Sequence, residues 1–201
     1  MRNLSLMGSA ALVLGCASMA FAQGQPAPAA PSTPMVELKV GDKAPNFKLQ
    51  GSDGKAHSLA DYAGKKVVAV AWFPAAFTQG CTIECKSLAE NGDKIKKYDA
   101  QYFMASTDSI EKNTEFAKAT KVMLNGNEVL KKEADFPLLS DPTKEVATAY
   151  GVLNARGTAS RWTFYIGKDG RILAIDKAVK PATSAEDMIA KFEELHVGKS
   201  N

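Results

Sequence analysis

The sequence predicts one α/β domain built on a mixed β-sheet. Two strand-like segments, residues 66–72 and 102–106, are each followed by a segment with helical periodicity. Near the end of the chain, residues 162–167 and 171–176 read as strands around the turn KDG at 168–170, which is typical of a hairpin. Strand–helix units favour parallel pairing and a hairpin adds antiparallel strands, so we expect strands of both directions in one sheet.

The first elements are short. Residues 45–50 and 55–58 read as two strands around a Ser-Asp-Gly turn. The segment KVVAVAW at 66–72 is an apolar, β-branched run typical of a strand that is buried on both faces. Pro74 ends this strand because it has no N–H to donate to a neighbour.

Helices and strands alternate after that point. Residues 80–97 follow a helical pattern, 102–106 read as a second central strand and 109–120 as a second helix. The polar insert at 124–135 is expected on the surface.

The remaining elements complete the sheet and cover it. Residues 136–139 read as a short strand and 143–150 as a short helix. A last helix is expected from Ser184, as N-cap, to about His196. This order is that of the thioredoxin-like fold, which places its reactive cysteine at the first strand–helix junction, where Cys81 stands.

The N-terminal segment predicts export. Residues 1–22 carry one positive charge, at Arg2, then an uncharged apolar run that closes on Ala-Phe-Ala. This pattern is typical of a cleaved secretory signal and indicates a periplasmic protein. An alternative is a lipoprotein box at Cys16, which would anchor the chain to a membrane. Residues 23–35 hold four prolines and read as a flexible leader, so the folded domain is expected over 36–201.

Charge excludes some partners. The chain has 25 Lys and Arg against 22 Asp and Glu, and the basic residues are dispersed. A dispersed, nearly balanced charge argues against nucleic acid or an anionic membrane as partner. We expect a monomer or a weak dimer.

Two cysteines remain after removal of the predicted signal, Cys81 and Cys85. A bridge between them would close a loop of three residues, which stabilises a fold very little. Exported proteins rarely keep thiols without a purpose, so the pair indicates redox or metal chemistry.

The spacing of the pair suits thiol chemistry. Cys81 falls in the first turn of a helix, where unpaired N–H groups favour an anion such as the nucleophilic thiolate. Cys85 lies one turn further on the same face, with Cβ atoms about 5–6 Å apart in an intact helix. A disulfide needs roughly 3.5–4.5 Å, so the first turn must unwind before the bond forms, and Gly80 would ease that change.

The residues around Cys81 resemble a known family. Pro74-x-x-x-Thr78-x-x-Cys81 is similar to the active-site pattern of the peroxiredoxins, which are thiol peroxidases of thioredoxin-like fold. The segments 136–152 and 161–172 resemble later blocks of that family, and the similarity spans nearly all of 37–195. Among its subfamilies the chain most resembles the Q-type, or bacterioferritin-comigratory, group.

The resemblance implies a division of roles between the cysteines. Cys81 would be the peroxidatic cysteine, which a peroxide oxidises to a sulfenic acid. Cys85 would be the resolving cysteine, which forms an intramolecular disulfide. Q-type members usually place that cysteine five residues after the peroxidatic one, whereas the interval here is four.

The resemblance also implies a pocket around Cys81. Pro74 would shield the thiolate, Thr78 would hydrogen-bond the peroxide, and Arg161 would stabilise the thiolate and the developing oxyanion. Glu84 would orient Arg161. Simpler roles remain open: Thr78 as a helix N-cap, Glu84 as a complement to the helix dipole, and Arg161 as a surface residue.

The implied activity reduces hydrogen peroxide or organic hydroperoxides. No cofactor is needed because sulfur carries the redox change, and the electrons would come from a thioredoxin-like thiol partner.

Two other functions use a similar fold. Exported copper-delivery proteins have a CxxxC pair and a distant histidine ligand, and two thiolates with an imidazole suit copper. The candidate histidines here, His57 and His196, read as lone surface residues, and Arg161 would repel a cation. A general thiol–disulfide oxidoreductase is the third possibility, although such proteins favour CxxC.

Overall fold

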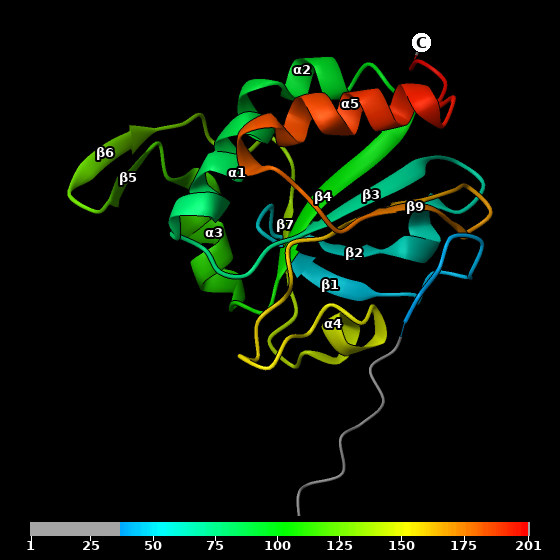
Figure 1. Cartoon of the computed structure of the whole chain (residues 1–201), viewed down its shortest axis with the longest axis horizontal. Helices are drawn as coiled ribbons and strands as arrows, with labels where there is room; N and C mark the ends of the chain where they lie inside the picture. Colours follow the sequence, from blue (N-terminus) through cyan, green and yellow to red (C-terminus); the bar gives the residue numbers. More distant parts are fainter. Residues whose placement is uncertain (1–36, 201) are drawn as a thin grey trace, which may run out of the picture. The chain divides into compact units, whose positions relative to one another are not determined.

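The computed structural model describes residues 37–200. The predicted signal at 1–22, with Cys16, and the leader at 23–35 therefore lie outside the described residues. The folded unit contains a seven-stranded sheet with helices on both sides and a separate two-stranded hairpin (Figure 1).

The sheet has mixed direction, as predicted. Its strand order is β2-β1-β7-β4-β3-β8-β9, with β3, β4 and β7 parallel and every other neighbouring pair antiparallel. The bounds are β1 Lys48–Gly51, β2 Ala56–Ser58, β3 Val67–Trp72, β4 Ala100–Ser106, β7 Leu138–Ser140, β8 Thr163–Ile166 and β9 Ile172–Asp176.

The central strand β3 divides the interior into two packed clusters. All six of its residues are buried, so neither face of this strand meets solvent. Ala69 and Ala71 belong to a cluster with helix residues such as Leu88, whereas Val68 and Val70 belong to a cluster on the other face. Because both faces of β3 pack against a core cluster, every position of the strand is apolar, which explains the continuous apolar run in the sequence.

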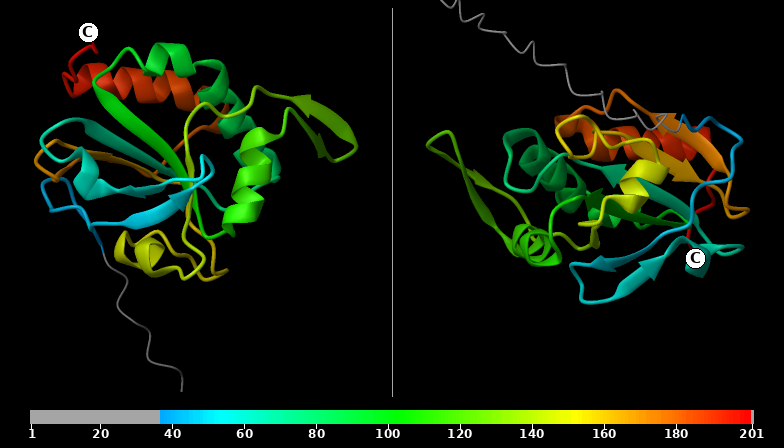
Figure 2. Two further views of the ribbon diagram at one scale, coloured as in Figure 1. Left: turned by 180° about the vertical axis from the view of Figure 1, so that it is seen from behind. Right: turned by 90° about the horizontal axis from the view of Figure 1, so that it is seen from below.

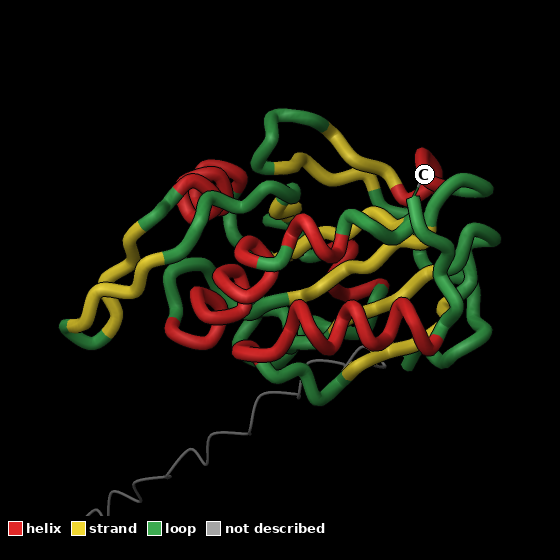
Figure 3. The backbone as a smooth tube through the Cα atoms, turned by 90° about the horizontal axis from the view of Figure 1, so that it is seen from above, coloured by secondary structure: helices red, strands yellow, loops and turns green. Residues whose placement is uncertain are grey.

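Helices cover both faces. The bounds are η1 Leu59–Tyr62, α1 Gln79–Glu90, α2 Gly92–Ile95, α3 Ile110–Lys118, α4 Glu145–Ala149, η2 Pro181–Thr183 and α5 Ser184–Glu194. Helices α1, α2 and α5 lie on one side of the sheet and α4 on the other (Figures 1 and 2). Seen from above, the helices lie in front of the strands (Figure 3). Ser87 of α1 accepts a hydrogen bond from the N–H of Ala185, which ties α1 to the start of α5.

The structure corrects two helix predictions. The helix predicted over 80–97 is two helices, because α1 ends at Glu90 and α2 starts at Gly92. A Cβ at Gly92 would lie 2.5 Å from a carboxylate oxygen of Asp135, so a larger residue here would displace the Asp135 side chain. Ser184 is the first residue of α5 and not its N-cap, which is Thr183.

The polar insert at 124–135 contains more structure than predicted. β5 Lys121–Leu124 and β6 Asn127–Leu130 form a hairpin that extends away from the sheet (Figure 1). Its turn is Asn125-Gly126, and both residues have positive φ, as a two-residue hairpin turn requires. Much of the hairpin is exposed, as expected, but Lys131 just after it is only 5% exposed.

No helix within residues 37–200 has both the length and the apolar character needed to cross a bilayer.

Candidate active site

The end of β3 delivers Cys81 to the start of α1. Phe73 donates its N–H to the carbonyl of Ala105 on β4, and the chain then leaves the sheet at Pro74. A short loop follows, and the helix begins with the bond from Thr82 N–H to the carbonyl of Thr78. Cys81 is the third residue of α1, where backbone N–H groups have no partner within the helix. The predicted position at the positive end of a helix is confirmed.

Antiparallel pairing brings Arg161 to Cys81. Because β8 runs antiparallel to β3, the start of β8 lies beside the end of β3, with Thr163 opposite Ala71. Arg161 precedes this start, and its Nη2 donates a hydrogen bond to Cys81 Sγ at 3.2 Å. A Cβ on Gly80 would lie 3.0 Å from the same Nη2, so glycine leaves room for this approach. The interpretation of Arg161 as a surface residue is wrong, because only 19% of its side chain is exposed.

Glu84 holds Arg161 from the next turn of the helix. Its Oε2 forms an ion pair with Arg161 Nη1, and its side chain is fully buried. Its other oxygen has no hydrogen-bond partner within residues 37–200. Burial raises the pKa of Glu84 to about 7, although Arg161 opposes that shift. Burial alone lowers the pKa of Arg161, but Glu84 and Cys81 outweigh it, so the net shift is upward.

Cys85 is a second buried thiol on the same face of α1. Both cysteines are fully buried, belong to the same core cluster and are free thiols. Burial raises the pKa of Cys85 to about 11, so its thiol is protonated at neutral pH. The structure describes the wound, reduced state; the disulfide stays a prediction.

Pro74 and Thr78 bound the loop before α1. Pro74 is half-buried and Thr78 is exposed at the N-cap position. The Thr78 hydroxyl does not cap the helix; it donates to the carbonyl of Ala75 at 2.9 Å. Between them Phe77 has a φ of 64°, an unfavourable value for a bulky residue, and its ring packs on Phe116. Such strain persists only where neighbouring contacts impose it.

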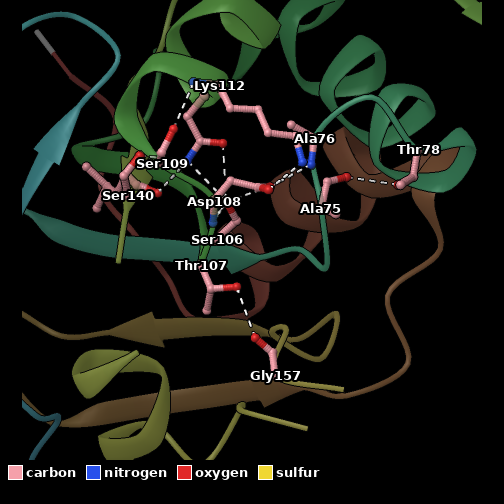
Figure 4. A network of polar contacts seen from close by, with 12 residues as sticks. Ala75, Ala76, Thr78, Ser106, Thr107, Asp108, Ser109, Lys112, Ser140 and Gly157 are labelled. Atoms are coloured by element: carbon pink, nitrogen blue, oxygen red, sulfur yellow. Dashed lines mark hydrogen bonds and ion pairs between the residues drawn. The ribbon is translucent and has the colours of Figure 1, made fainter. Parts of the chain in front are cut away.

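Asp108 supplies one of those contacts and was not predicted. It follows β4, and its Oδ2 accepts the N–H of Ala76 at 2.8 Å (Figure 4). Ser106 donates to the same oxygen, and Lys112 of α3 donates to Oδ1 at 2.6 Å. Asp108 therefore fixes the middle of the loop that carries Pro74 and Thr78. Its partner is a backbone N–H, which leaves no trace in the sequence.

Within residues 37–200, the donors that a copper site requires are not brought together. The guanidinium of Arg161 lies against Cys81, where it opposes a bound cation. The imidazole of His57 bonds to Asp53 at 3.0 Å and to Tyr62 at 3.1 Å and contacts neither cysteine. With 12% of its side chain exposed, His57 is not the surface residue that we predicted. The copper-delivery alternative is not favoured.

Comparison with known proteins agrees with this geometry. Residues 40–175 match the AhpC/TSA family. Peroxiredoxin Bcp of Escherichia coli is 35% identical over 145 residues, which are 69% of this chain and 85% of that protein. Peroxiredoxin Bcp of Bacillus subtilis is 29% identical over 165 residues, which are 79% and 97% of the two chains. The crystal structure of peroxidoxin BcpB from Mycobacterium tuberculosis superposes with a TM-score of 0.67 at 26% identity, covering 79% and 99%.

A buried thiol at a helix start with an arginine against it, on a thioredoxin-like fold, defines a thiol-dependent peroxidase. The chain belongs to the AhpC/TSA family and is a peroxiredoxin close to the Bcp group.

The raised pKa of Glu84 predicts how stability depends on pH. The folded protein keeps this proton up to about pH 7, whereas an unfolded glutamate loses it near pH 4.3. Between these values the folded state binds more protons, so the free energy of unfolding falls as pH rises. Urea unfolding of wild type and Glu84→Gln from pH 4 to 8 should show that fall, on the order of 3 kcal/mol at most, in wild type only. Parallel curves would contradict the assignment.

The Asp108 contact predicts a selective loss of reactivity. Asp108→Ala frees the Ala76 N–H and loosens the loop, so Cys81 should react with hydrogen peroxide about tenfold more slowly in stopped-flow measurements. Alkylation of Cys81 by iodoacetamide needs only access to the sulfur, which a looser loop increases, so it should not slow. Lys112→Ala is the matched control, because it removes the ion pair and keeps the bond to Ala76. Equal losses in both reactions, or in both variants, would rule out a positioning role.

Proposed function

We propose that Cys81 is the peroxidatic cysteine of this peroxiredoxin and that Cys85 resolves it. The observation that carries the proposal is the contact between Arg161 Nη2 and Cys81 Sγ, 3.2 Å apart at the start of α1. This is the one thiol of the described chain that a guanidinium contacts. A cation and a helix N-terminus both stabilise a thiolate, the form that attacks peroxide.

The first step transfers one oxygen atom. The Cys81 thiolate attacks one peroxide oxygen, the O–O bond breaks, and Cys81 becomes a sulfenic acid while the other oxygen leaves as hydroxide or alkoxide. The leaving oxygen takes a proton to give water or an alcohol. Arg161 stabilises the negative charge that develops on the oxygens, and the Thr78 hydroxyl orients the peroxide from the exposed side of the loop.

Pro74 and Glu84 support this step without touching the peroxide. Half-buried Pro74 offers no N–H and limits the access of water to the sulfur. Buried Glu84 holds one arm of the guanidinium, which leaves the other arm for Cys81. Because Cys81 is fully buried, a small peroxide must enter as the loop and the first turn of α1 move.

The second step forms the disulfide. The sulfur of Cys85 attacks the sulfur of the Cys81 sulfenic acid, an S–S bond forms, and the hydroxyl leaves as water with the proton of the Cys85 thiol. Cys85 lies one turn from Cys81 in a wound helix, so the first turn of α1 must open. A thioredoxin-like dithiol then reduces the disulfide by thiol–disulfide exchange and is itself oxidised.

Substitution of each cysteine separates their roles. Cys81→Ser should abolish rapid consumption of hydrogen peroxide. Cys85→Ser should consume one equivalent of peroxide in a single turnover at the wild-type rate and then stop turning over with thioredoxin as reductant. Stopped-flow kinetics and steady-state assays measure the two quantities. Full turnover by Cys85→Ser would overturn the resolving role, and loss of the single turnover would overturn the peroxidatic role of Cys81.

We further propose that the protein works in the periplasm, after cleavage behind Ala22. The support is the signal-like pattern of residues 1–22 and the leader that follows it. The full chain, expressed in a Gram-negative bacterium and recovered by osmotic shock, should have the intact mass of residues 23–201. A lipid-modified chain starting at Cys16 would support the lipoprotein alternative instead, and an uncleaved chain retained in spheroplasts would contradict export.

A further inference from the structure

Lys131 is a buried cation that the peroxidase chemistry described above does not use. It follows β6, and only 5% of the residue is exposed. Its ammonium donates to the carbonyls of Ala117 and Lys132, each at 3.2 Å, and lies 5.5 Å from the ring centre of Phe116. None of the ion pairs within residues 37–200 includes it.

A buried ammonium without a carboxylate is costly. Removing a charge from water is expensive unless an opposite charge or several good hydrogen bonds replace the water. Two carbonyls at the long end of the hydrogen-bond range leave the third N–H of this ammonium without a partner among residues 37–200. The site would therefore gain from an anion that forms nearby.

Cys85 is the buried acidic group whose charge interacts with the Lys131 ammonium. Phe116, over which the ammonium lies, packs in the same core cluster as Cys85. Lys86, the neighbour of Cys85 on α1, donates to the carbonyl of Leu130 at 2.8 Å, and Leu130 directly precedes Lys131. This bond fastens the end of the hairpin to the turn of α1 that carries Cys85.

We propose that Lys131 assists the resolving step by stabilising the thiolate of Cys85 as it attacks the sulfenic acid of Cys81. The proposal rests on the proposed function, in which Cys85 resolves Cys81. The Cys85 sulfur forms the S–S bond, the S–O bond of the sulfenic acid breaks, and the leaving hydroxide takes the proton that Cys85 has lost. Lys131 keeps its own proton throughout, so it acts on Cys85 only through its positive charge.

The electrostatics of both groups agree with this role. Burial raises the pKa of Cys85, and the Lys131 ammonium opposes that shift, while Glu84 and Cys81 reinforce it. Burial lowers the pKa of Lys131, and Cys85 and Glu133 oppose that shift. The charged groups that act on the Cys85 thiol are therefore one cation, Lys131, and two potential anions, Glu84 and Cys81.

A purely structural role is the competing explanation. Ala117 is in the last turn of α3, so Lys131 could serve only to cap that helix. A cap affects stability and leaves the chemistry of Cys85 unchanged, so the two roles differ in what they do to the rate of disulfide formation.

The test measures resolution separately from peroxide reduction. Reduced protein is mixed with one equivalent of hydrogen peroxide, quenched at intervals, and analysed by mass spectrometry for sulfenic acid and disulfide. For each unit by which a thiol pKa rises, its thiolate fraction falls tenfold while its nucleophilicity rises about threefold, so the net loss is about threefold. Lys131→Met should slow disulfide formation at least threefold and leave sulfenic acid formation unchanged, whereas Lys131→Arg should stay close to wild type.

Lys132→Met is the matched control. It removes the next lysine along the chain, which is exposed and contacts Lys131 only through a backbone carbonyl that the substitution keeps. Its resolution rate should stay within twofold of wild type. Equal resolution rates in wild type and Lys131→Met, or equal losses in the two Met variants, would overturn the role of Lys131. If wild type forms no disulfide between Cys81 and Cys85, the resolving role of Cys85 itself fails, which is a different outcome.

Discussion

The guanidinium of Arg161 is the group on which the arrangement of the site depends. It contacts Cys81 with one nitrogen and Glu84 with another, so it links the first turn of α1 to the start of β8. The antiparallel pairing of β8 with β3 brings it to that place, and Gly80 leaves space for it. The buried carboxylate of Glu84 aligns it. Together these features hold the positive charge of Arg161 against the sulfur of Cys81.

Burial of both thiols limits the access of peroxide and solvent to them. Cys81 and Cys85 lie in one core cluster beneath α1, so neither meets solvent in the reduced state. The proposed resolution by Cys85 requires the first turn of α1 to open. Two contacts lie on either side of that turn: Asp108 holds the preceding loop through Ala76, and Lys86 holds the hairpin through Leu130.

Much of this could be predicted from the sequence. The strand–helix order and the place of Cys81 follow from sequence patterns. The roles expected of Arg161 and Glu84 follow from the resemblance to the peroxiredoxins, and the structure brings these three residues together. Asp108 could not be found because it acts on a backbone N–H 32 residues away. Lys131 could not be found because a lysine in a polar insert reads as exposed, and only tertiary packing buries it. The β5–β6 hairpin could have been predicted from its Asn125-Gly126 turn.

Chemical trapping of the sulfenic acid is the sharpest test of Cys81 as the site of oxidation. Cys85→Ser is treated with one equivalent of hydrogen peroxide in the presence of dimedone, digested, and mapped by mass spectrometry. We expect a dimedone adduct on Cys81 in nearly all molecules, and a large reduction of that adduct in the same protein with Arg161→Met. A Cys81 that remains a free thiol after peroxide has been consumed would contradict this expectation.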